Sequence, residues 1–289
     1  MTAVFALTTS LLWGLADFGG GLLTRRIPAL TVVLVSQLLA VGVLGTVVVA
    51  TGAWTEAGPR LWFAVAAGAV GPAAMLAFYR ALALGPMGIV APLGALGGVA
   101  VPIGVGIAAG ERPGPLQFTG IAIAVTGVVL ASGPARGGTP IARQTLMYTL
   151  LAAFGFGAVM ALIAEASTTL TGLFLALFVQ RVCNVLVGGT ALWVSVRRGG
   201  RALPQDGGAG AVRAALPALA FVGLADVAAN GTYNLAANSG PVTVAAVLAS
   251  LYPVVTALAA RGVLSERLRS MQAAGAGLAL VGTVLLAAG

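Results

Sequence analysis

The stretch ALTVVLVSQLLAVGVLGTVVVAT, residues 29–51, decides the fold class, because it is long, apolar and free of charged side chains. A helix of about 20 residues crosses the hydrocarbon core of a bilayer, so this stretch is long enough for one span. Lipid offers no water to backbone groups, and an apolar run inside it must therefore be helical. Similar runs elsewhere bring the total to about ten spans; they cover residues 3–23, 60–83, 86–109, 115–132, 142–165, 171–195, 213–236, 241–263 and 270–288.

The composition of the whole chain supports an all-α integral membrane protein. Hydrophobic residues make up 59% of the 289 residues, mean hydropathy is +1.04, and only 8% of the residues are charged. A soluble protein carries about 25% charged residues, so most of the surface of this protein must face lipid. Residues 3–23 are expected to form a retained first helix and not a signal peptide, because no basic residue precedes them.

Several classes of function are excluded or disfavoured. The net charge of +8 does not indicate nucleic-acid binding, because the 15 basic residues are all arginines and most lie singly or in pairs between apolar runs. The chain has one cysteine, Cys183, and no histidine. This excludes a disulfide framework, histidine-ligated metals and histidine-based acid–base catalysis. We expect no cofactor and no enzymatic activity. The alternatives from other classes are a membrane-embedded lipid-modifying enzyme, which would need converging catalytic groups, and a structural or sensory membrane subunit.

The two halves of the chain resemble each other. At an offset of 155 residues (240 − 85 = 155), Gly85-Pro86 matches Gly240-Pro241, Glu111-Arg112 matches Glu266-Arg267, and Gln117 matches Gln272. The pattern predicts two five-helix repeats, residues 1–135 and 140–289. Because five is odd, the second half enters the membrane from the opposite face. Inverted repeats of this kind are typical of transporters, whose substrate site lies near the midplane between the halves.

An ionisable side chain at the centre of a membrane helix costs about 2.5–3.5 kcal/mol on insertion, so each one inside a span indicates a structural or functional role. Asp17, Arg181 and Asp226 lie near span centres, whereas Arg80 and Glu165 lie near span ends, where they can reach the interface. Other polar residues share helix faces with the deeper ones and should face the bundle interior. The predicted substrate-binding or coupling residues are Trp13, Asp17, Gln37, Tyr79, Gln180, Arg181, Asn184, Asp226, Asn230, Tyr233, Ser250 and Tyr252.

The same residues also have structural interpretations. Arg181 and Asp226 can form an ion pair between helices, because an unpaired arginine at that depth is costly. Asp17 has no partner by repeat symmetry, so we predict that it carries protons or binds a cationic group. Trp13 either packs in the bundle or stacks on the substrate.

One part of each half resembles a known family. The run ASLYPVVTAL (residues 249–258), with LSERL (264–268) and QAAG (272–275) after it, is similar to the end of an EamA domain, and LLWG (11–14) is similar to part of its first helix. The first half repeats this ending as GER (110–112) and QFTG (117–120). The resemblance spans nearly the whole chain and implies the drug/metabolite transporter superfamily, with ten helices in two repeats. Gly98 departs from the family pattern, which usually has a proline there; Pro92 and Pro102 flank it.

These features predict a secondary transporter of small amphipathic metabolites or drugs, with amino-acid-like or organic-cation substrates. We expect an exporter that works by alternating access around a midplane cavity, since the chain has no ATP-binding P-loop. A passive facilitator and an importer of the same fold are alternatives. The expected partners are a small-molecule substrate, protons as coupling ions and the lipid bilayer, without nucleic acid, and the protein should be a monomer or a weak homodimer. The predicted location is a bacterial plasma membrane.

The arginines outside the spans predict an orientation. The loops after spans 2 and 4 lie on one side of the membrane, and that side holds only two arginines, Arg60 and Arg112. Cytoplasmic loops are rich in arginine, so this distribution favours both termini outside, whereas the family resemblance implies both inside. We follow the arginine distribution. The arginines on the opposite side are Arg25, Arg26, Arg136, Arg143, Arg197, Arg198, Arg201, Arg213, Arg261, Arg267 and Arg269.

Overall fold

The regular structure of the chain is helical. The computed structural model describes residues 1–97, 100, 101, 104, 107, 114–132, 141–167, 169–239, 245, 248–265 and 270–288, and no strand occurs among them. The helices are α1 (Thr2–Leu23), α2 (Ala29–Thr51), the 3-10 helix η1 (Ala53–Glu56), α3 (Leu61–Leu84), α4 (Met87–Ala95), α6 (Pro115–Ser132), α7 (Arg143–Ala166), α8 (Leu170–Arg197), α9 (Gly208–Ala214), α10 (Leu216–Asn238), α12 (Tyr252–Leu264) and α13 (Ser270–Ala288). The predicted all-α fold class is confirmed.

Five of the described helices are long and apolar enough to cross a membrane, namely α1, α2, α3, α7 and α8. A sixth candidate is the pair α9 and α10, which is bent by 50° at its break. This bend divides the span predicted at 213–236, and Pro217 lies in the first turn of α10 beside it, where a missing backbone N–H costs nothing. The spans predicted at 86–109 and 241–263 are described in part, by α4 and α12. Gly98, Pro102 and the Glu-Arg pairs of the repeat lie outside the described residues.

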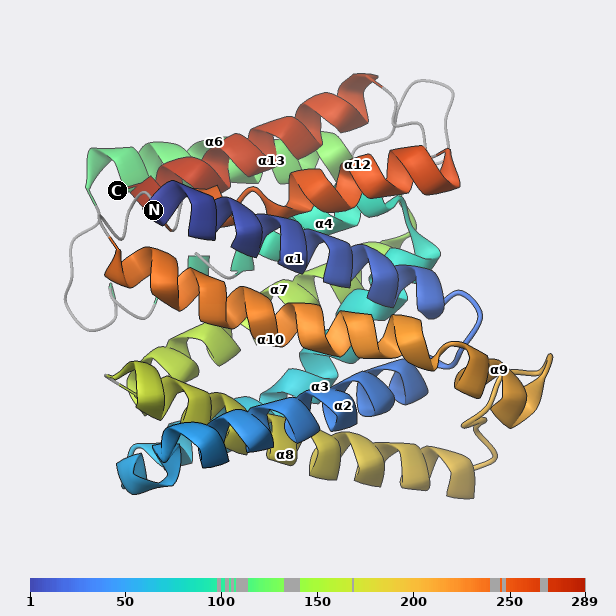
Figure 1. Ribbon diagram of the computed structural model, residues 1–289. Coiled ribbons are helices and arrows are strands. Elements are labelled where there is room, and N and C mark those ends of the chain that lie inside the picture. Colours follow the sequence, from blue (N-terminus) through green and yellow to red (C-terminus); the bar gives the residue numbers. More distant parts are fainter. Residues whose placement is uncertain are drawn as a thin grey trace.

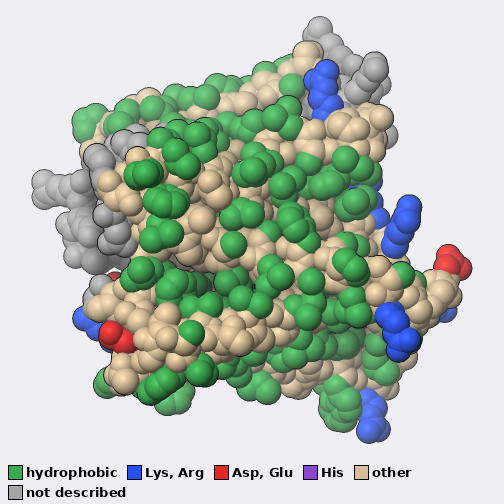
Figure 2. Space-filling view, in the orientation of Figure 1, with side chains coloured by type: hydrophobic (Ala, Val, Ile, Leu, Met, Phe, Trp, Pro, Cys, Tyr) green, Lys and Arg blue, Asp and Glu red, His purple; other side chains and the backbone are tan. Residues whose placement is uncertain are grey.

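The outer surface has the apolar character of a surface in lipid. Phe154, Leu186 and Leu258 are each more than 60% exposed, and Figure 2 shows hydrophobic side chains across the middle of one face. Basic side chains appear at its margins, mainly along one edge. Burying hydrophobic side chains in lipid replaces the polar shell of a soluble protein, which explains why so few charged residues are sufficient.

The two ends of the bundle differ in charge. Figure 1 shows both termini at one end, with α9 and the connection between α1 and α2 at the other. We call the second end the arginine-rich end. Its exposed arginines include Arg25, Arg26, Arg197, Arg198, Arg201 and Arg213. Arg60, at the start of α3, lies at the end that holds the termini.

The helix contacts that join the two five-helix halves are symmetric: a contact between two helices recurs between their repeat counterparts. α2 packs on its counterpart α8 and α6 packs on its counterpart α13, and α4, from the fourth span of the first half, packs on α12, from the fourth span of the second half. The contact of α1 with α10 likewise corresponds to the contact of α7 with α3. Small residues permit this close packing: a Cβ on Gly127 of α6 would lie 2.7 Å from the carbonyl oxygen of Gly275 on α13.

The helices are interrupted at matching positions in the two halves. A turn at Leu96 follows α4, and a turn at Ser250 and Leu251 precedes α12. Leu96 and Leu251 are separated by the same 155 residues as the other repeat matches (251 − 96 = 155). Pro253 lies in the first turn of α12, where a missing backbone N–H costs nothing. Broken helices in corresponding positions often mark a transporter's binding site.

The largest cluster of buried apolar side chains among the described residues lies at the arginine-rich end. It combines residues from the last turns of α1 and α3 with residues from the first turns of α2, α4 and α10, such as Phe18, Val32, Leu82, Met87 and Leu219. These side chains are almost fully buried. They close the centre of the bundle at this end.

Candidate functional site

A cavity of about 400 Å³ lies between the two halves of the chain. Residues from α1, α2, α3, α4, α7, α8, α10, α12 and α13 line it, and so does Ser250 in the turn before α12. Ala95, the repeat counterpart of Ser250, also lines it, so both helix interruptions border the cavity. The structure brings every predicted site residue to this one cavity: Trp13, Asp17, Gln37, Tyr79, Gln180, Arg181, Asn184, Asp226, Asn230, Tyr233, Ser250 and Tyr252. Their roles in binding and coupling remain predictions.

The ion pair suggested by the sequence is present. The guanidinium of Arg181 on α8 contacts the carboxylate of Asp226 on α10, and its other terminal nitrogen donates to the side-chain oxygen of Gln37 on α2 at 3.0 Å. Asn184 donates to the same Gln37 oxygen at 3.1 Å. Asn230, one turn after Asp226, donates to the Asp226 backbone oxygen at 2.7 Å. A buried charge needs partners of this kind, and the network joins α2, α8 and α10.

A glycine makes room for this network. Asn184 is 1% exposed, and its amide lies directly against Gly71 of α3. A Cβ at Gly71 would lie 2.6 Å from the side-chain oxygen of Asn184. Only a residue without a side chain lets α3 approach α8 this closely, so Gly71 leaves room for the Asn184 amide that contacts Gln37.

Asp17 differs from Asp226 in having no partner. It is half-buried on α1, and no hydrogen bond or ion pair joins its carboxylate to another described residue. Arg181 is the one arginine of the described residues that is buried, and Asp226 already engages it. The two groups expected near the interface, Arg80 and Glu165, are both exposed. Glu165 does not line the cavity, and Asp17 is the one acid among the described lining residues that has no ion-pair partner.

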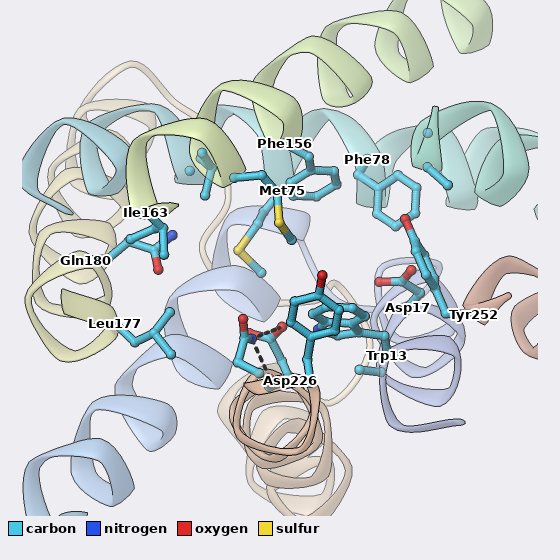
Figure 3. A pocket seen from close by; sticks show the side chains of 18 of the residues that line it. Trp13, Asp17, Met75, Phe78, Phe156, Ile163, Leu177, Gln180, Asp226 and Tyr252 are labelled. Atoms are coloured by element: carbon cyan, nitrogen blue, oxygen red, sulfur yellow. Dashed lines mark hydrogen bonds between the residues drawn. The ribbon is translucent and has the colours of Figure 1, made fainter. Parts of the chain in front are cut away.

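An aromatic cluster lies near Asp17 on the cavity wall. Trp13 lies one turn before it on α1, and its ring is 5.9 Å from the ring of Tyr233 and 5.9 Å from that of Tyr252, measured between centroids. Figure 3 shows Trp13, Asp17 and Tyr252 together on one side of the cavity. The backbone around them is held by Thr256, whose hydroxyl donates to the Gly14 carbonyl oxygen at 3.0 Å. This position is compatible with both interpretations of Trp13, stacking on the substrate and packing in the bundle.

The rest of the wall is apolar and was not predicted. Met75, Phe78, Phe156 and Leu177 line the cavity together with further aliphatic side chains, and the rings of Phe78 and Phe156 meet edge to face at 5.3 Å. In Figure 3, Met75 and Phe156 lie across the cavity from Asp226. An apolar residue in a membrane helix is equally stable against lipid or another helix, so the sequence carried no signal for these positions.

The cavity contains no evident metal site. No group of three or more acidic, cysteine or histidine side chains suited to a metal ion occurs in the part of the chain that the structure describes. What the wall offers is one unpaired carboxylate, a neutralised ion pair, amides and aromatic rings.

Comparison with known proteins assigns the chain to a family. The EamA-like transporter family matches it twice, over residues 1–133 and 143–288. The chain belongs to the EamA-like transporter family. This family is part of the drug/metabolite transporter superfamily, so the chain is a multi-pass membrane protein and a membrane transporter of that superfamily. Its family consists of transporters and not of enzymes.

A solved structure shares the fold of this EamA family member. A crystal structure described only as that of a protein aligns with 98% of this chain and 95% of its own, with a TM-score of 0.60 and 18% sequence identity. At this identity the likeness shows the fold alone. No curated protein matches the chain.

Proposed function

We propose that this EamA-family protein is a secondary transporter that exports small amphipathic metabolites or drugs through the central cavity. The observation that carries the proposal is the convergence of both halves on one cavity, which combines a long apolar wall with a small polar cluster. Sites for small molecules have this character, with few polar groups that set orientation and many apolar ones that bind the body. A carrier also needs a site that each side of the membrane can reach in turn.

The arrangement of the helices supports alternating access. The buried cluster around Phe18, Leu82 and Met87 closes the cavity at the arginine-rich end. Ala95 and Ser250, at the two helix interruptions, lie on the cavity wall, where a helix can bend with little loss of backbone hydrogen bonding. In the proposed cycle the two halves rock about the cavity, and this cluster separates when the arginine-rich end opens.

The charge distribution supports an orientation for this cycle. Because arginine-rich loops stay in the cytoplasm, the proposed topology places the arginine-rich end inside and both termini outside. The end closed by the Phe18 cluster is then the cytoplasmic end. The alternative with both termini inside is the one that the family resemblance implied.

Transport is tested with purified protein in liposomes. We expect the protein to accelerate the flux of amphipathic amines, amino acids or related metabolites over empty vesicles. Ala249 lines the cavity, and Ala249→Trp should fill it and abolish flux. Leu258→Trp is the matched control, because Leu258 lies on the nearby α12 and is 63% exposed toward lipid. Absence of flux across a broad panel, with folded protein, would reject the proposal.

A further inference from the structure

We infer that the cavity selects monovalent organic cations with an apolar body over amino acids and organic anions, and that the charged nitrogen binds beside Asp17. This inference rests on the proposed transport function and decides between two substrate classes that the sequence left open. Four features of the cavity carry it: its charge balance, the exposure of its charged groups, its aromatic rings and its apolar wall.

The charge balance favours a cation. Among the described lining residues, two are acids, Asp17 and Asp226, and one is a base, Arg181. Arg181 and Asp226 neutralise each other in the ion pair. An ionised Asp17 therefore leaves one negative charge without a counter-ion in a site of low dielectric, where an uncompensated charge is costly. A single positive charge, from a substrate or a proton, restores neutrality.

The exposure of the ion pair favours a cation as well. The Arg181 side chain is 8% exposed, whereas that of Asp226 is 25% exposed. The Nε of Arg181 has no hydrogen-bond partner and is fully buried, so a ligand in the cavity does not reach it. A substrate in the cavity thus meets the carboxylate of the pair more than the guanidinium. A substrate carboxylate would have to draw Arg181 away from Asp226 and would leave that acid unpaired.

The aromatic rings supply a second attraction for a cation. The Trp13 ring lies 5.9 Å from the ring of Tyr233 and 5.9 Å from that of Tyr252, measured between centroids, and all three residues line the cavity with Asp17. The face of an aromatic ring attracts cations, most strongly for tryptophan and in desolvated sites. Rings next to a carboxylate are the common arrangement for binding alkylammonium groups, and the same rings offer nothing to an anion.

The apolar part of the cavity wall suits the body of such a cation. Met75, Phe78 and Phe156 present sulfur and ring surfaces to the cavity. Methionine side chains adapt to ligands of different shape, and a cavity of about 400 Å³ has room for a single aromatic ring with its side chain. The wall therefore selects for an apolar body without specifying one compound.

A proton and the cation compete for Asp17. The titratable groups that interact with it electrostatically are Asp226 from α10, Tyr79 from α3 and Tyr252 from α12. Arg181 on α8 acts through its pair with Asp226, and Tyr233 belongs to the adjoining ring cluster. α2 and α4 carry no titratable side chain. A cation and a proton cannot both occupy Asp17, so binding weakens as the pH falls, and each cation that binds to protonated Asp17 releases one proton.

The binding test uses compounds that share one aromatic body. Phenethylamine is cationic, benzyltrimethylammonium is cationic without an N–H donor, phenylalanine is zwitterionic, 3-phenylpropionate is anionic and 2-phenylethanol is neutral. Calorimetric titration of the full chain in nanodiscs should show binding of the two cations about thirty-fold or more tighter than that of the other three. Titration in buffers of different ionisation enthalpy measures the released proton.

Three variants complete the test. Asp17→Asn should lose cation binding by about the same factor and abolish proton release, and Asp17→Glu should retain both in part. Glu165→Gln removes an exposed carboxylate outside the cavity and should change neither. Melting of each variant checks folding, and Asp17→Glu keeps the test decisive if Asp17→Asn does not fold.

The outcomes separate this inference from the proposed function. If phenylalanine or 3-phenylpropionate binds as tightly as phenethylamine, or if Asp17→Asn binds the cations normally, the assignment of substrate class is wrong. Liposome flux of those same acids would then leave the transport proposal standing. If no compound binds and none crosses the membrane, both are wrong.

Discussion

Replacing Asp226 by asparagine tests the ion pair at the centre of the bundle. Asn occupies nearly the same volume and still accepts a hydrogen bond, so the substitution removes charge with little change in packing. It leaves Arg181 buried with a positive charge that only neutral acceptors contact, among them the Gln37 oxygen at 3.0 Å. Breaking a fully buried pair costs about 3–5 kcal/mol. Because the Asp226 side chain is 25% exposed and water reaches it, we expect a smaller loss of about 2–3 kcal/mol.

The loss is measurable by thermal unfolding. At about 2–4 °C per kcal/mol for a chain of this size, Asp226→Asn should lower the melting temperature by about 5–10 °C. Cys183 is the chain's single cysteine and is half-buried on α8, so a thiol-reactive fluorogenic dye reports unfolding without an added label. Glu165→Gln, at an exposed carboxylate, is the matched control and should melt like the wild type.

A double-mutant cycle identifies the cause. Arg181→Met alone strands Asp226 and should also destabilise the protein, whereas Asp226→Asn with Arg181→Met removes both charges and should recover most of the loss. Two results would refute the reasoning. One is an Asp226→Asn variant that melts within about 1 °C of the wild type; the other is a double variant whose loss equals the sum of the single losses.

Three further expectations follow from named contacts. Asp17→Asn should abolish flux driven by a pH gradient in liposomes while its melting curve stays near that of the wild type; normal pH-driven flux would assign coupling elsewhere. Gly71→Ala adds a methyl group 2.6 Å from the amide oxygen of Asn184 and should destabilise the protein by about 1–3 kcal/mol in the same melting assay; an unchanged melt would show that α3 can move aside. In a cysteine-free background, a membrane-impermeant maleimide applied to intact cells should label a cysteine at exposed Thr55 but not one at exposed Arg26; the reverse pattern would place both termini in the cytoplasm.

The polar side chains that the sequence placed inside the bundle all line the central cavity, for a reason specific to membranes. Polar side chains such as Asp17, Gln37 and Asn230 are costly against lipid, so each had to face the interior of the bundle. In a soluble protein the same residues would be equally stable on the surface. The apolar residues Met75, Phe78 and Phe156 gave no such signal, because lipid and protein interior are similar solvents for them.

Sequence alone therefore determined the all-α membrane fold class, the approximate helix boundaries and the choice of Asp226 as a partner for Arg181. The reasons are local: the length of an apolar run must match the bilayer, and a charge within it needs an opposite charge. The tertiary structure alone decided which residues share one cavity, that α10 begins at a 50° bend after α9, and that Asp17 has no partner among the described residues and lines the cavity with three aromatic rings. These features depend on how helices that are far apart in the chain rotate about their axes and cross one another. Hydrophobic periodicity does not encode the rotation or the crossing angle when both faces of a helix are apolar.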